Sequence, residues 1–130
     1  MSGLTEYNRL GAEEARQILT DEIEEIRHVK QWAEKAGYSV SKLQRIISHY
    51  YGMTAKETLK LIRYKRIIKL IKEDPSVTSY NVALNTGLKN EQDLYKFLKR
   101  NFNTSFTEIR EDVSQIIIGK KTVVEQKGYK

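Results

Sequence analysis

The same succession of helical patterns and turns occurs twice in this chain, about fifty residues apart. This repeat limits the possible folds more than any other property of the sequence. Each time, a short apolar helical pattern stops at a glycine, Gly37 or Gly87, and a longer pattern begins a few residues later. The longer patterns end at Gly52 and Asn103, residue types that tolerate the left-handed backbone at which helices often end. A helix, a tight turn and a second helix form a helix-turn-helix, so the repeat predicts two such units.

Capping signals mark where helices begin. In the first unit, Ser39 or Ser41 can accept the free backbone N–H groups at the start of the second helix. The segments Thr54-Ala55-Lys56-Glu57 and Ser105-Phe106-Thr107-Glu108 both fit a capping box, in which a hydroxyl and a carboxylate bond to each other's backbone N–H. The first box opens a long apolar pattern that ends before Pro75, the single proline. This long helix is expected to join the two units.

An acidic segment precedes the first unit. Ala15, Leu19, Ile23 and Ile26 recur at helical spacing among acidic neighbours, which predicts an amphipathic helix over 11–29 that packs against the rest. The pattern from Ser114 onward fits either a helix or a small hairpin, and the last residues are expected to be disordered. The predicted fold is all-α, with about seven helices and two homeodomain-like helix-turn-helix subdomains joined by a long linker helix. Its parts are an N-terminal acidic helix (1–27), the first subdomain with the linker helix (28–72), the second subdomain (73–113) and a C-terminal tail (114–130).

The composition excludes several classes of protein. The 130 residues include no cysteine, so a disulfide framework and a thiolate metal site are both excluded, and a cytoplasmic location is the default expectation. No signal-peptide pattern and no apolar run of about 18 to 20 residues occurs, so neither secretion nor a membrane partner is expected. His28 and His49 lie far apart, and no phosphate-binding glycine loop or nucleophile motif is present. We therefore expect no enzyme activity, no catalytic residue, no metal and no cofactor.

The net charge of +6 is distributed unevenly along the chain. Residues 27–72 hold 12 basic and 2 acidic side chains, a net charge of +10 in 46 residues. Residues 1–26 hold 2 basic and 7 acidic side chains, a net charge of −5, and residues 73–113 hold 5 and 7, a net charge of −2. A single basic run can be a solvated surface, but this concentration favours a polyanion partner such as double-stranded DNA.

The repeated units resemble the DNA-binding domain of the AraC/XylS family of bacterial transcription regulators, over about residues 29–113. Gly37 and Leu43 are six positions apart, and Gly87 and Leu94 are seven positions apart, as in the family. Departures from the family pattern are Ile67 in the linker and Leu88, Leu98, Phe106 and Ile109 in the second unit. The resemblance rests on two runs of residues: Ala36-Gly37-Tyr38-Ser39-Val40-Ser41-Lys42-Leu43-Gln44-Arg45-Ile46-Ile47 with Tyr51-Gly52-Met53-Thr54, and Val82-Ala83 with Thr86-Gly87-Leu88 and Asn101-Phe102-Asn103-Thr104-Ser105.

The resemblance implies that the second helix of each unit is a recognition helix, which enters the major groove of DNA. In the first unit, Gln44 could pair with adenine and Arg45 with guanine, each pair contributing about 1 to 3 kcal/mol of discrimination. Without the resemblance, both side chains read equally well as solvated helix residues. The base-reading residues that the resemblance implies here are Val40, Ser41, Lys42, Gln44 and Arg45.

The second unit is more acidic, so the first is expected to dominate. Glu91 could accept a hydrogen bond from a cytosine amine but would also repel phosphate, and Asp93 adds to this repulsion. Weak base contact and simple backbone anchoring are both open for this helix. The positions that match the base-reading set are Asn90, Glu91, Gln92, Tyr95 and Lys96, and the predicted phosphate contacts are Ser39, Lys89, Lys99 and Arg100.

The linker helix carries Arg63, Lys65, Arg66 and Lys69 and, by resemblance, connects the units rigidly. Two recognition helices would then enter successive major grooves about 34 Å apart, so that one monomer covers an asymmetric and somewhat bent site. An activator of this kind would also contact RNA polymerase. Three hypotheses follow: a stand-alone regulator, a piece of a longer regulator, or a protein-interaction adaptor that keeps the fold with weak or no DNA binding.

Overall fold

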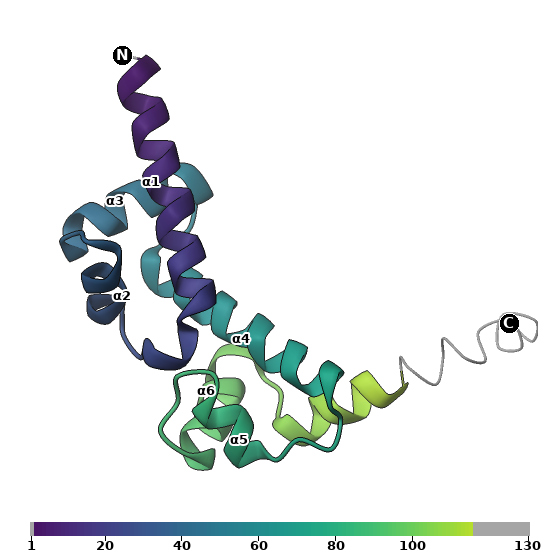
Figure 1. The fold of residues 1–130 in the computed structure, drawn as a ribbon. Helices are drawn as coiled ribbons and strands as arrows, with labels where there is room; N and C mark the ends of the chain where they lie inside the picture. Colours follow the sequence, from purple (N-terminus) through teal and green to yellow (C-terminus); the bar gives the residue numbers. More distant parts are fainter. Residues whose placement is uncertain (1, 116–130) are drawn as a thin grey trace, which may run out of the picture.

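A computed structural model describes residues 2–115 of the chain, with side chains from residue 9 onward, and within this range every regular element is a helix (Figure 1). This confirms the predicted all-α fold. The expectation of a helix or hairpin after Ser114 falls almost wholly on residues 116–130, which lie outside the described range. The elements are α1 (Ser2–Asp21), the 3-10 helix η1 (Ile23–Glu25), α2 (Val29–Ala36), α3 (Val40–Tyr51), α4 (Ala55–Glu73), α5 (Ser79–Leu84), α6 (Glu91–Phe102) and a helix over residues 106–115.

The N-terminal helix packs against the first unit as predicted, but its bounds differ from the expected ones. Helix α1 begins at Ser2 and ends at Asp21, and a short 3-10 turn then replaces the single helix expected to reach Val29. Leu19, Ile23 and Ile26 are all buried, so the apolar spacing is kept. Ile26 adopts an extended backbone, with φ −115° and ψ 109°, which turns the chain toward α2.

The turns use left-handed backbone at the positions that the sequence indicated. Gly37, Gly52 and Gly87 have φ of 79°, 65° and 84°, and Asn103 has φ of 49°. Ser39 and Thr54 cap α3 and α4 through bonds to the backbone N–H groups of Lys42 and Glu57. The capping box at Thr54 is complete, and the box at Ser105 is partial, because the Glu108 carboxylate accepts from the Thr104 hydroxyl instead.

Two apolar cores lie at opposite ends of α4. The first is built around Trp32, which is fully buried and donates its indole N–H to the backbone oxygen of Ala15 at 2.8 Å. The second is built around Leu94 and Leu98 of α6 and includes the helix over residues 106–115. Helix α4 supplies Leu59 and Ile62 to the first core and Ile67 and Ile71 to the second. It therefore connects the two helix-turn-helix units, α2–α3 and α5–α6 (Figure 1).

Arg63, in the middle of α4, ties the segment before the first unit to the turn of the second unit. Its side chain is 4% exposed, and its guanidinium donates to the backbone oxygen of Thr86 at 2.7 Å and to that of Ile26. It also lies over the Phe97 ring, 5.7 Å from the ring centroid. Burial lowers the pKa of Arg63 to about 10, so the side chain is still charged at neutral pH. The chain before the first unit, the linker helix and the turn of the second unit thus meet at one cation.

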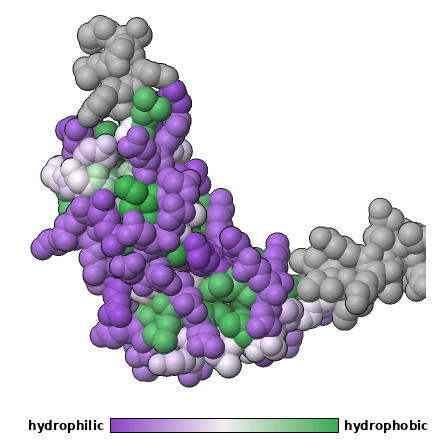
Figure 2. All heavy atoms as spheres, viewed as in Figure 1, coloured by the Kyte–Doolittle hydropathy of each residue, from purple (hydrophilic) through white to green (hydrophobic). Residues whose placement is uncertain are grey.

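Gly87 makes the same junction close-fitting. A Cβ atom at this position would lie 2.4 Å from the backbone oxygen of Ile23 and 2.7 Å from that of Ile26. Only glycine combines the positive φ with this close backbone approach. The face shown in Figure 2 is mostly hydrophilic with small apolar patches, and no helix within residues 2–115 has the length and apolar character needed to cross a bilayer.

Candidate nucleic-acid interface

Helix α3 presents a polar face because its opposite face is buried. Leu43, Ile46 and Ile47 are in the first core, which turns Ser41 and Arg45 to the solvent. Val40 is 44% exposed at the first position of the helix. Val40, Ser41 and Arg45 are therefore accessible at the start of α3, and their reading of bases stays a prediction.

Two of the predicted first-unit residues interact with side chains beside them. Lys42 is half-buried, and its ammonium lies 5.0 Å from the centroid of the Tyr38 ring, which orients it along the start of α3. The Ser39 hydroxyl accepts from the backbone N–H of Lys42 at 3.1 Å. Because a hydroxyl both accepts and donates, this bond does not use the proton of the Ser39 hydroxyl, and its predicted contact with phosphate stays a prediction.

Gln44 has a structural role that the sequence did not reveal. Its side-chain NH₂ donates to the Ser48 hydroxyl at 2.7 Å, and its side-chain oxygen accepts from the backbone N–H of Ala55 at 2.9 Å. The Ala55 N–H is one of the donors that the first turn of α4 leaves free, so Gln44 ties the recognition helix to the linker helix. Reading of adenine by Gln44 remains a prediction, and it would require these bonds to open.

Helix α6 begins with a cap and two carboxylates. The Asn90 side chain accepts from the backbone N–H of Asp93 at 2.9 Å, and the Glu91 carboxylate accepts from the Ser79 hydroxyl of α5. Glu91 is therefore held toward α5. Gln92 and Lys96 are exposed, and Tyr95 is 57% exposed. The three predicted phosphate contacts of this unit, Lys89, Lys99 and Arg100, are exposed as well.

A hollow of about 260 Å³ lies between the two units. Its cationic lining comes from the segment with net charge +10, and of these cations only Arg63 was among the linker cations named from the sequence. Their placement depends on the packing of α2, α4 and α6 around Arg63. The lining residues are Arg27, His28, Val29, Lys56, Leu59, Lys60, Arg63 and Phe97.

A family of helix-turn-helix domains matches this chain over residues 32–112. The chain is 29% identical to a probable transcription factor, PqrA of Proteus vulgaris, over 82 residues, which cover 62% of this chain and 65% of that protein. The match thus spans just under two thirds of the relative's length. The two helix-turn-helix units and the capped helix α4 that joins them agree with the match to a helix-turn-helix family.

Solved structures share the fold. The C-terminal domain of AraT, a response regulator from Geobacillus stearothermophilus, superposes with a TM-score of 0.68 at 18% identity, covering 78% of this chain and 84% of that one. A DNA-binding transcriptional dual regulator from Escherichia coli K-12 superposes with a TM-score of 0.64 at 16% identity, covering 81% and 93%. The chain belongs to the AraC-type helix-turn-helix family, whose members are transcription regulators.

Proposed function

We propose that this chain binds double-stranded DNA in a sequence-specific manner and regulates transcription. The observation that carries the proposal is the pair of capped helices, α3 and α6, each with an exposed polar face and each fixed to one end of α4. A helix-turn-helix uses such a face to reach base edges in the major groove. Exposed cations of the segment 27–72, which carries a net charge of +10, supply attraction to phosphate.

The first unit dominates recognition in this proposal. The exposed start of α3 carries Ser41 and Arg45 and no carboxylate. The first turn of α6 carries Glu91 and Asp93, which repel the phosphate backbone. Helix α6 therefore contributes through Gln92 and Lys96, with more weight on backbone contacts than on base reading.

The cations of the hollow between the units add a central phosphate contact. Lys56 and Lys60 lie one turn apart on α4, and Arg27 reaches the same hollow from the segment before α2. Three cations thus gather between the two units, and in this proposal they neutralise phosphates of the DNA stretch between the two grooves.

The rigid connection has consequences for the shape of the DNA site. Arg63 and the two cores hold the units in one relative orientation. The spacing and direction of the two DNA grooves must therefore adapt to the protein. Since the two recognition helices differ in sequence, one monomer covers an asymmetric site of two grooves about 34 Å apart. Where the spacing of the two recognition helices does not match straight DNA, the DNA bends.

Selection of binding sites from random duplexes tests the proposal. The parent is compared with Ser41→Ala/Arg45→Ala in the first unit and Gln92→Ala/Lys96→Ala in the second. We expect the parent to select a two-part asymmetric site with one protein per duplex by sedimentation. The first-unit variant loses the preference in one part, and the second-unit variant weakens binding by a smaller factor with its preferences kept. Equal loss in both variants would contradict first-unit dominance, and a palindromic site with two proteins would contradict monomeric binding.

A further inference from the structure

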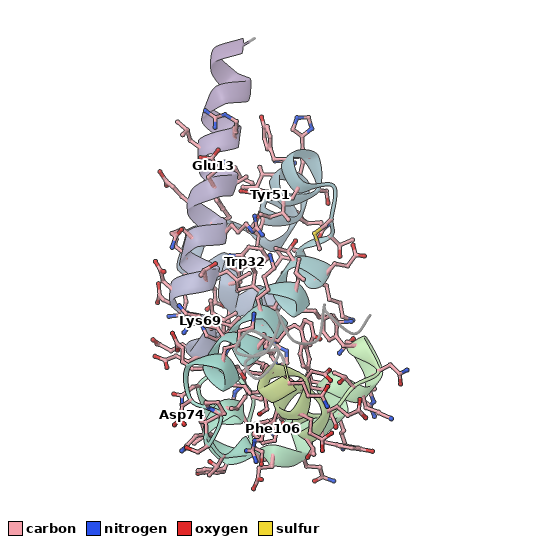
Figure 3. All side chains as sticks on the ribbon, turned by 90° about the vertical axis from the view of Figure 1, so that its right-hand side faces the viewer. Glu13, Trp32, Tyr51, Lys69, Asp74 and Phe106 are labelled. Atoms are coloured by element: carbon pink, nitrogen blue, oxygen red, sulfur yellow. The ribbon has the colours of Figure 1, made fainter. Side chains whose placement is uncertain are left out.

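A second hollow lies on the other side of α4, where α1 crosses it. Its volume is about 470 Å³, within the range of about 300 to 1,000 Å³ that is common for small-molecule sites. Figure 3 labels Glu13 on α1, Tyr51 on α3 and Lys69 on α4. None of the lining residues belongs to the predicted DNA-contacting set. They are Glu13, Arg16, Gln17, Thr20, Tyr51, Ile62, Lys65, Arg66 and Lys69.

The charge of this hollow is strongly one-sided. Four of its lining residues are cations, Arg16, Lys65, Arg66 and Lys69, against the single carboxylate of Glu13. Glu13 forms its ion pair with Arg9. Within residues 9–115, none of the four cations lies at salt-bridge distance from a carboxylate. Four cations around one concave space repel one another, and an anion placed there relieves this repulsion.

The two arginines are held in place by the protein. Arg66 is half-buried and donates from one nitrogen to the backbone oxygen of Thr20 at 2.7 Å, which leaves its other N–H groups for a second acceptor. Arg16, also half-buried, lies over the Tyr51 ring at 5.0 Å from its centroid. Fixed guanidinium groups lose little freedom on binding and suit bidentate contact with phosphate or carboxylate oxygens. Lys65 and Lys69 are exposed and add two positive charges to the lining of the hollow.

We propose that this α1–α4 groove binds a compact, multiply charged small anion, either a phosphorylated or a polycarboxylate metabolite. The concave shape and the recessed arginines fit a small ligand better than a duplex, which would meet the cations on a convex surface. The ligand bridges α1 and α4, so it stabilises the packing of the N-terminal helix on the linker helix. This site is separate from the DNA interface and does not depend on it.

Titration calorimetry with sodium tripolyphosphate and with citrate, at constant ionic strength, tests the site. The test variant is Lys65→Gln/Lys69→Gln, and the matched control is Lys96→Gln/Lys99→Gln, which removes the same charge from the exposed face of α6. All four lysines are exposed, so both variants are expected to fold, and far-ultraviolet circular dichroism checks this. We expect the test variant to bind at least one of the two anions about tenfold more weakly, with the control unchanged within twofold.

Backbone amide shifts in nuclear magnetic resonance spectra give a second readout that does not depend on the variants. Added tripolyphosphate or citrate should shift the amides of Gln17, Thr20 and Lys69 more than those of α6. If tripolyphosphate shifts these amides more than citrate does, the groove prefers phosphate, and the opposite result indicates a preference for carboxylate. Equal weakening in both variants, shifts confined to α6, or no binding of either probe would overturn the proposal. So would a loss of DNA affinity in Lys65→Gln/Lys69→Gln as large as in the control, because the groove would then be part of the DNA interface.

Discussion

Replacing Arg63 by alanine should destabilise the protein and uncouple its two units. The substitution removes the donor from two buried backbone oxygens, those of Ile26 and Thr86. A buried polar group without a partner costs about 1 to 3 kcal/mol, and relief from desolvating the guanidinium offsets part of this loss. The free energy of unfolding should therefore fall by about 2 to 4 kcal/mol. The stability of Arg63→Lys should lie between those of the parent and Arg63→Ala, because a single ammonium replaces the guanidinium that bonds to both oxygens.

Denaturant unfolding followed by two probes measures both effects. Trp32, the single tryptophan, is in the first core and its fluorescence reports that core, whereas circular dichroism reports all the helices. In the parent the two transitions should coincide, and in Arg63→Ala their midpoints should separate because the cores no longer share the buried cation. Arg45→Ala, which removes an exposed arginine, is the control and should change stability by no more than about 0.5 kcal/mol. A change as small as this in Arg63→Ala, with coincident transitions, would refute the reasoning.

Three further substitutions test the junction, the acid stability and the first core. Gly87→Ala should destabilise by at least about 1 to 2 kcal/mol by thermal unfolding, because its positive φ and the nearby Ile23 oxygen both oppose a Cβ; a neutral result would contradict the described turn. The bonds to Thr54 lower the pKa of the Glu57 carboxyl below its ordinary value of 4.5. The stability that this carboxylate adds to the protein is therefore complete above about pH 4.5 and is lost as pH falls through the lowered pKa. Glu57→Gln should flatten this part of the pH–stability profile, and an unchanged profile would count against the cap. Trp32→Phe should cost about 1 to 3 kcal/mol through the lost indole hydrogen bond to the Ala15 oxygen and the lost buried volume, and stability equal to the parent would show that the indole bond contributes nothing.

The local features of the fold could be predicted from the sequence because they depend on neighbouring residues. Helical spacing of apolar residues, the caps at Ser39 and Thr54, and the left-handed positions at Gly37 and Asn103 are each encoded within a few residues. The start of α1 at Ser2 was missed because residues 2–10 carry a weak apolar pattern. The break after Asp21 was missed because the apolar spacing continues through it.

The contacts between distant segments could not be predicted in this way. Arg63 was grouped with the other linker cations, but it bonds to residues 23 and 37 positions away, and only the packing of distant segments buries it. Gln44 shows the same limit, since its bond to Ala55 depends on the angle between α3 and α4. The cationic α1–α4 groove also arises from packing, because Arg16 and Lys69 come from helices that the sequence does not place together.

The salt dependence of DNA binding tests the central claim most directly. Fluorescence anisotropy of a labelled mixed-sequence duplex is titrated with the protein at several salt concentrations, for the parent and for Arg45→Ala. The proposed phosphate contacts of both units and of the central hollow predict binding at roughly 50 mM salt that weakens steeply, with a log–log slope of about −4 or steeper. Arg45→Ala should weaken binding to the selected site more than to the mixed duplex. Absence of binding at low salt, or a slope near zero, would contradict a DNA-binding function and favour an adaptor that keeps this fold.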